Sequence, residues 1–115
     1  TLRAPARLGW GNAMRFLLTG EEFGAEEALR IGLVQEVVEP GKHIARAREI
    51  AQLIAKQAPI GVQGTLANAR LMESRGQAAA TEHLVELLGK VMSSEDAAEG
   101  MMSFIERREA VFTGK

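Results

Sequence analysis

Apolar and polar positions alternate along this chain with the period of short amphipathic helices, which are separated by glycine and proline. The segment from His43 to Lys56 is the clearest example, because its apolar residues share one arc of a helical wheel and its polar residues fill the other. The apolar arc consists of Ile44, Ala47, Ile50, Ala51 and Ile54. The pattern therefore predicts an amphipathic helix over residues 43–56.

Two shorter helices are predicted before it. The first begins at Gly11 or Asn12 and stops at Gly20. The second covers residues 25–31 and is closed by Gly32, which stands where helices commonly end with a glycine.

One stretch has the composition of a strand instead. Residues 33–38 read LVQEVV, and Pro40 and Gly41 follow as a break. We therefore expect one short strand near residues 33–38.

The second half of the chain is predicted to be helical throughout. Pro59 suits the first turn of a helix, since its missing N–H costs nothing there, and this helix should fray toward Gly76. The next helix carries an apolar stripe made of Ala80, Leu84, Leu87, Leu88 and Val91. The run SSED at 93–96 then offers an N-cap hydroxyl and first-turn acids, so a last helix should extend to about Arg108 or Ala110.

Composition limits the classes of function. With 14 Lys plus Arg against 15 Asp plus Glu, the formal net charge is -1, so we expect neither nucleic acid nor a membrane as a partner. The absence of cysteine excludes disulfides and thiolate metal sites and fits a cytoplasmic location. The 115 residues suffice for one core, so we predict one mainly α-helical domain over 1–115.

The first 20 residues allow two interpretations. They contain Arg3, Arg7 and Arg15 and no acidic residue, which superficially resembles a mitochondrial transit peptide. Pro5 and Gly9 would interrupt a continuous amphipathic helix, which favours an ordinary helical segment. Because the chain does not begin with Met, we expect the gene product to begin upstream.

No complete catalytic or metal-binding pattern is present. Gly41-Lys42 and Gly89-Lys90 lack the upstream glycine and the following Ser or Thr of a phosphate-binding loop. His43 and His83 have no further ligands at metal-binding spacing, so we predict no metal site and expect structural or solvent-exposed histidines.

The last predicted helix carries one candidate ligand-binding face. On a helical wheel, Gly100, Phe104 and Arg107 form a flank separate from the apolar stripe. A small residue beside an aromatic ring and a guanidinium suits a planar or phosphorylated group. Alternatively, Phe104 packs on a neighbouring subunit and Arg107 is solvated.

The order of several short motifs resembles one known family. The string RLGWGNAMRFLLTGEEFGAEEALRIGLVQEVVEPG at 7–41 is similar to the enoyl-CoA hydratase/isomerase (crotonase) superfamily. The tail agrees, with SED at 94–96, EG at 99–100, FIERR at 104–108 and a closing Phe112. Each block alone is weak, but the ordered set covers essentially the whole chain.

The resemblance implies a fold and an activity. In this family an N-terminal spiral of ββα units supplies the oxyanion hole and two catalytic glutamates. The present chain resembles the helical C-terminal (trimerisation) domain, so we expect no catalytic residue in it. The parent protein would hydrate a 2-enoyl-CoA through an oxyanion-stabilised enolate, without a metal or redox cofactor. The alternatives are an isomerase or another thioester-processing member, or a helical assembly module without chemistry.

The resemblance also implies ligand contacts and partners. Phe104 and Arg107 match an aromatic and a basic residue that lie near the adenine and the 3′-phosphate of CoA in a neighbouring active site. Leu88 stands where some members have an aromatic residue, which puts a contribution to the acyl pocket in doubt. The expected partners are an acyl-CoA substrate and further copies of the chain, as a trimer or hexamer.

Overall fold

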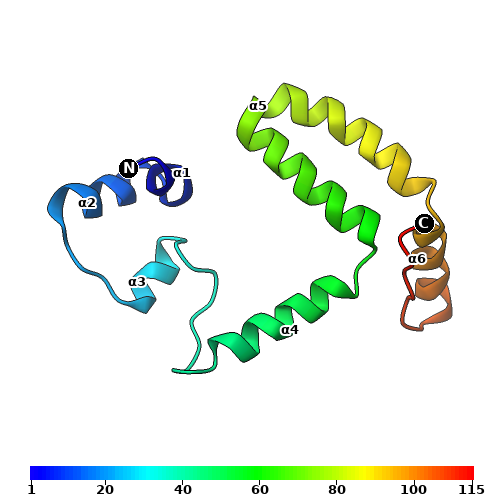
Figure 1. Ribbon diagram of the computed structural model, residues 1–115, viewed down its shortest axis with the longest axis horizontal. Coiled ribbons are helices and arrows are strands. Elements are labelled where there is room, and N and C mark those ends of the chain that lie inside the picture. Colours follow the sequence, from blue (N-terminus) through cyan, green and yellow to red (C-terminus); the bar gives the residue numbers. More distant parts are fainter. The chain divides into compact units, whose positions relative to one another are not determined.

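The computed structural model describes residues 1–115 and consists of helices and connecting loops (Figure 1). The chain forms two compact units, residues 1–47 and residues 48–115. Helix α4 (His43–Ala55) begins in the first unit and ends in the second. The mainly α-helical class predicted from the sequence is confirmed.

The first unit contains three helices, namely α1 (Arg3–Leu8), α2 (Trp10–Thr19) and α3 (Ala25–Arg30). Gly9 has a φ of 76°, which lets the chain turn sharply between α1 and α2. Gly20 adopts the left-handed conformation and donates its N–H to the carbonyl of Phe16, which confirms the predicted end of α2. Helix α1 was not predicted, although its Pro5 lies in the first turn, where a missing N–H is tolerated.

Residues 33–38 form no strand, so the predicted strand is wrong. The backbone N–H groups of Leu33 and Val34 instead donate to the carbonyl of Ala28, at 2.9 and 3.3 Å. A strand is stabilised by hydrogen bonds to a neighbouring strand, and this chain contains none. The apolar pattern of this segment therefore belongs to an irregular loop that closes α3.

The second unit contains the rest of α4, together with α5 (Pro59–Met92) and α6 (Glu95–Glu106). Pro59 opens α5, as predicted. Gly76 interrupts α5 with a φ of 81° and a ψ of -179°. Because only glycine adopts this backbone conformation readily, α5 doubles back there into two arms, residues 59–75 and 77–92 (Figure 1).

A close approach at Gly64 brings the two arms of α5 together. A Cβ atom at this position would lie only 2.2 Å from Cδ1 of Leu87, so no larger residue fits unless Leu87 moves. One turn further along, Nδ1 of His83 lies 2.9 Å from Oδ1 of Asn68. These two contacts place the arms antiparallel and side by side.

Helix α6 begins where the sequence predicts and ends earlier. The hydroxyl of Ser94 accepts a hydrogen bond from the N–H of Ala97 at 3.1 Å and so caps the helix. At the other end, Arg107 adopts the left-handed conformation, with φ 54° and ψ 41°, and terminates the helix after Glu106. The predicted end at Arg108 or Ala110 is therefore wrong.

Few apolar side chains are buried in this chain. The buried ones are Ala13, Ala28, Ile31 and Ala80. The arc predicted on α4 is helical as expected, but Ile44 is 54% exposed and Ile54 is 51% exposed. The helices thus have apolar faces that no other part of this chain covers. None of the helices combines the length and the apolar run that crossing a bilayer requires.

Candidate functional site

The C-terminal end of the chain folds back along α6. The chain reverses direction at Arg107, and residues 108–115, here called the C-terminal strap, return toward the start of α6 (Figure 1). The carbonyl of Lys115 accepts a hydrogen bond from the N–H of Asp96 at 3.1 Å. The strap therefore spans the helix almost from its last residue to its first turn.

Asp96 fastens the far end of the strap. This residue is only 2% exposed, and its two carboxylate oxygens accept the N–H groups of Thr113 at 2.7 Å and Gly114 at 2.8 Å. Hydrogen bonds to a charged acceptor are among the stronger ones in proteins. Asp96 is thus a structural carboxylate whose oxygens are occupied by the strap.

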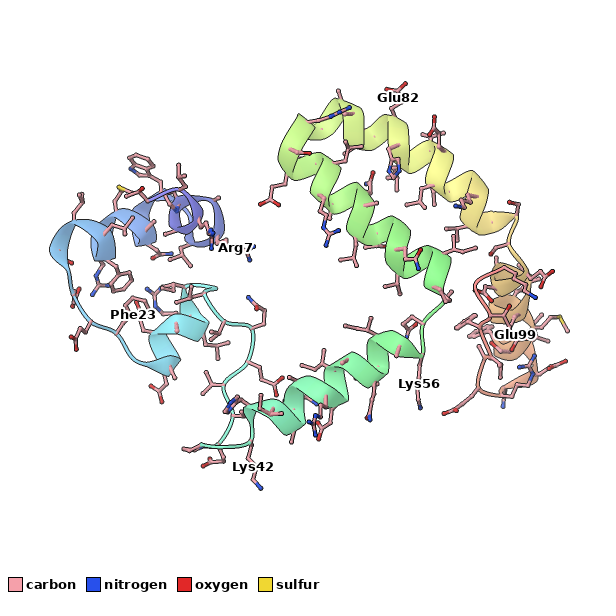
Figure 2. All side chains as sticks on the ribbon, viewed as in Figure 1. Arg7, Phe23, Lys42, Lys56, Glu82 and Glu99 are labelled. Atoms are coloured by element: carbon pink, nitrogen blue, oxygen red, sulfur yellow. The ribbon has the colours of Figure 1, made fainter.

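Glu99 fastens the near end of the strap (Figure 2). Its carboxylate accepts two parallel hydrogen bonds from the Arg108 guanidinium, at 2.5 and 2.7 Å, and a third from the N–H of Val111 at 2.8 Å. These bonds, chiefly those from Arg108, lower the pKa of Glu99 from 4.5 to about 2. The stabilisation is therefore present above pH 4.5 and is lost progressively as the pH falls from 4.5 through about 2.

The two residues predicted to bind CoA lie at the turn between α6 and the strap. Phe104 is 85% exposed in the last turn of the helix. Arg107 is exposed and forms no ion pair, whereas the adjacent Arg108 is bound by Glu99 and Glu106. Of these two neighbouring guanidinium groups, only that of Arg107 is free to bind a ligand.

Gly100 does not belong to this exposed face, contrary to the helical-wheel prediction. A Cβ atom on Gly100 would lie 3.6 Å from the ring of Phe112, so the strap covers this position. The wheel also assumed that Arg107 is part of the helix, whereas it is the residue that ends it. The predicted flank is reduced to Phe104 and Arg107, and their binding of CoA stays a prediction.

Comparison with known proteins decides the family. The enoyl-CoA hydratase/isomerase family matches the chain over residues 1–115. The chain belongs to this family. It is 42% identical to the (E)-benzylidenesuccinyl-CoA hydratase of Thauera aromatica over 99% of its length, and 37% identical to the short-chain-enoyl-CoA hydratase of Clostridium acetobutylicum over 95%.

Solved structures of the enoyl-CoA hydratase/isomerase family agree with this assignment. A crystal structure of a probable enoyl-CoA hydratase/isomerase from Mycobacterium abscessus matches 99% of the chain with a TM-score of 0.91 and 52% sequence identity. The chain covers 44% of that protein, and 44% and 42% of the two curated relatives. It therefore spans less than half the length of the family members that it matches.

Two glutamates of this chain, Glu27 and Glu99, are unsuited to act as a general acid at neutral pH. Hydrogen bonds from arginine side chains lower the pKa of Glu27 and of Glu99, whereas a general acid at neutral pH needs a raised pKa. His43 is exposed and His83 is half-buried against Asn68. No group of three His, Cys, Asp or Glu side chains lies close enough to hold a metal ion.

The strap is the part of the site that the sequence analysis missed. The acidic residues at the start of α6 were attributed to helix capping alone, and Glu99 and Arg108 are too far apart in the chain for a contact within one helix. Their pairing depends on the reversal at Arg107. No glycine marks that reversal, so the sequence offers no local signal for it.

Proposed function

We propose that this chain is the C-terminal part of an enoyl-CoA hydratase, which adds water across the double bond of a 2-enoyl-CoA. The observation that carries the proposal is the 42% identity to a CoA-thioester hydratase over nearly the whole chain. The thioester oxygen of the enolate-like intermediate is stabilised by backbone N–H groups, and glutamates outside this chain move the protons. This chemistry uses no metal or redox cofactor.

In this proposal, α6 contributes to substrate binding through Phe104 and Arg107. The exposed ring of Phe104 stacks on the adenine of CoA, and the Arg107 guanidinium pairs with the 3′-phosphate. The exposure of both side chains and the lack of an ion pair at Arg107 support this role. Neither residue takes part in bond breaking or bond making.

The reaction itself is tested with the full-length protein and crotonyl-CoA. We expect the absorbance of the conjugated thioester to fall, and oxygen-18 from labelled water to appear at C3 of the product. Conversion of a 3-enoyl-CoA to the 2-enoyl isomer without hydration would instead assign the isomerase reaction. If neither reaction occurs, the hydratase proposal is wrong, and the alternatives are another thioester reaction of the family or an assembly role without chemistry.

The full-length protein is also proposed to assemble into a trimer or a hexamer. The support is a set of exposed apolar side chains on amphipathic helices, including Ile44, Leu53, Leu84, Leu88, Met101 and Ile105. Large apolar surfaces of this kind commonly mark an interface between subunits. Sedimentation at micromolar concentration should give a trimer or a dimer of trimers, and a clean monomer would contradict the proposal.

A cytoplasmic location completes the proposal, together with an acyl-CoA as the small-molecule partner. It is supported by the absence of cysteine, which fits a reducing compartment. The formal net charge of -1 gives no general attraction for nucleic acid or for an anionic membrane surface.

A further inference from the structure

We propose that Glu99 and Asp96 are positioning residues for the nucleotide part of CoA. By fastening the C-terminal strap at two points, they hold Arg107 in the conformation that presents its guanidinium to the ligand. This inference rests on the proposed function, in which Arg107 binds the 3′-phosphate. It adds two residues that do not touch the substrate.

The backbone of Arg107 requires such support. Arg107 is the only residue other than glycine with a positive φ, at 54°, and a Cβ atom disfavours that conformation. Two backbone hydrogen bonds close the helix end, from Arg107 to Phe104 at 3.4 Å and from Arg108 to Ser103 at 3.1 Å. Helix ends that are closed by such bonds usually have glycine at the left-handed position. Because Arg107 stands there instead, we infer that the contacts of the strap help to hold its backbone in this conformation.

Glu99 also decides which of two adjacent arginines is free. Arg107 and Arg108 follow one another, and a phosphate at this turn could attract either. The bidentate bond from Arg108 to Glu99 removes Arg108 from this competition, and Glu106 adds a further ion pair to Arg108. At this turn, the 3′-phosphate therefore has only one unpaired guanidinium to bind, that of Arg107.

Asp96 keeps the strap in register along α6. Its hydrogen bonds to Thr113 and Gly114 lie at the opposite end of the strap from Arg107. Between the two fastened ends, the Phe112 ring packs over Gly100, where no side chain is in the way. With both ends held, the turn at Arg107 cannot open without breaking contacts at Glu99 or at Asp96.

The test compares Glu99→Gln and Asp96→Asn in the full-length protein. The first substitution removes the ion pair with Arg108, and the second turns an amide N–H₂ toward one of the two backbone N–H donors of the strap. Because both changes loosen the turn, we expect KM for an enoyl-CoA to rise about three- to tenfold with little change in kcat. KM for the corresponding pantetheine thioester, which has no 3′-phosphate, should not change.

Glu95→Gln is the matched control for these two variants. Glu95 lies in the same first turn as Asp96, is exposed, and forms no hydrogen bond or ion pair with the strap. The substitution removes one negative charge from α6 and leaves the strap fastened. We therefore expect wild-type kinetics with both thioesters, and a KM increase as large as that of Glu99→Gln would overturn the positioning role.

Amide hydrogen exchange at Thr113 and Gly114 reports on the strap independently of catalysis. Asp96→Asn should speed exchange at these amides by about tenfold or more, because they lose a charged acceptor. If exchange accelerates and KM for the enoyl-CoA stays unchanged, the strap does not position Arg107. In that case the inference is wrong, and a CoA role of Arg107 itself still stands if Arg107→Ala raises KM.

A second variant covers the possibility that Asp96→Asn does not fold. Deleting residues 113–115 from the full-length protein removes the far end of the strap and leaves every residue of α6 intact. It should raise KM for the enoyl-CoA as Asp96→Asn does. Equal losses with the CoA and the pantetheine substrates would show that the strap only holds the domain together, which overturns the inference.

Discussion

The isolated 115-residue chain is expected to give no turnover with crotonyl-CoA. Hydration needs two backbone N–H groups aimed at the thioester oxygen and an acid–base pair, and the proposed function assigns both to the part of the protein outside this chain. Its two strap-binding carboxylates, Asp96 and Glu99, are already occupied by hydrogen bonds. Since enzymes of moderate power accelerate their reactions about a millionfold or more, the difference from the full-length protein should be of that order.

The measurement compares the fragment and the full-length protein at equal concentration in the same assay. Intact mass verifies the fragment, and circular dichroism shows whether its helices have formed. A folded fragment without activity agrees with catalytic residues upstream. Turnover above the rate in buffer would show that some of the chemistry lies in these 115 residues, and the proposed division of roles would have to be abandoned.

The helices of this chain were predictable where a single residue determines the local backbone. Gly20 and Pro59 end and begin helices for reasons that act within one turn, and Ser94 caps α6 through one hydrogen bond. The family was also recognisable, because its motifs are ordered along the sequence. The features that the sequence did not predict correctly depend on contacts with residues outside the local segment.

The incorrect strand near 33–38 illustrates the first kind of failure. Its three valines are compatible with a strand, but only a neighbouring strand makes that conformation stable. The strap illustrates the second kind. Glu99 and Arg108 meet only because Arg107 reverses the chain without a glycine, and that reversal is itself stabilised by their contact. Neither feature has a local cause that a sequence pattern can reveal.

The candidate binding residues could be proposed from the sequence, but their environment could not. A helical wheel places Phe104 and Arg107 on one flank, and the structure leaves both exposed. The wheel singled out Arg107, but it gave no indication that only one of the two adjacent arginines is free of an ion pair. That distinction comes from Glu99, which binds Arg108 and leaves its neighbour unpaired.

Replacing Arg107 by Ala in the full-length protein should raise KM for an enoyl-CoA about tenfold, with kcat little changed. A charge-assisted contact contributes about 1.5–3 kcal/mol when well formed and less where solvent reaches it, and each 1.4 kcal/mol is about tenfold in affinity. A contact made equally in the ground state and the transition state changes KM and not kcat. With a pantetheine thioester, which lacks the 3′-phosphate, wild type and variant should behave alike.

One further variant separates the guanidinium from the backbone conformation that carries it. Arg107→Gly removes the charge and relieves the left-handed backbone, so it should weaken CoA binding as much as Ala does if the guanidinium is responsible. Arg75→Ala removes another exposed arginine of the second unit and controls for net charge, so its KM should stay at the wild-type value.

Phe104→Ala should show the pattern of Arg107→Ala more weakly, because adenine stacking is also specific to CoA. If Arg107→Ala instead impairs both thioesters equally, the residue supports the assembly and its role in binding CoA must be dropped.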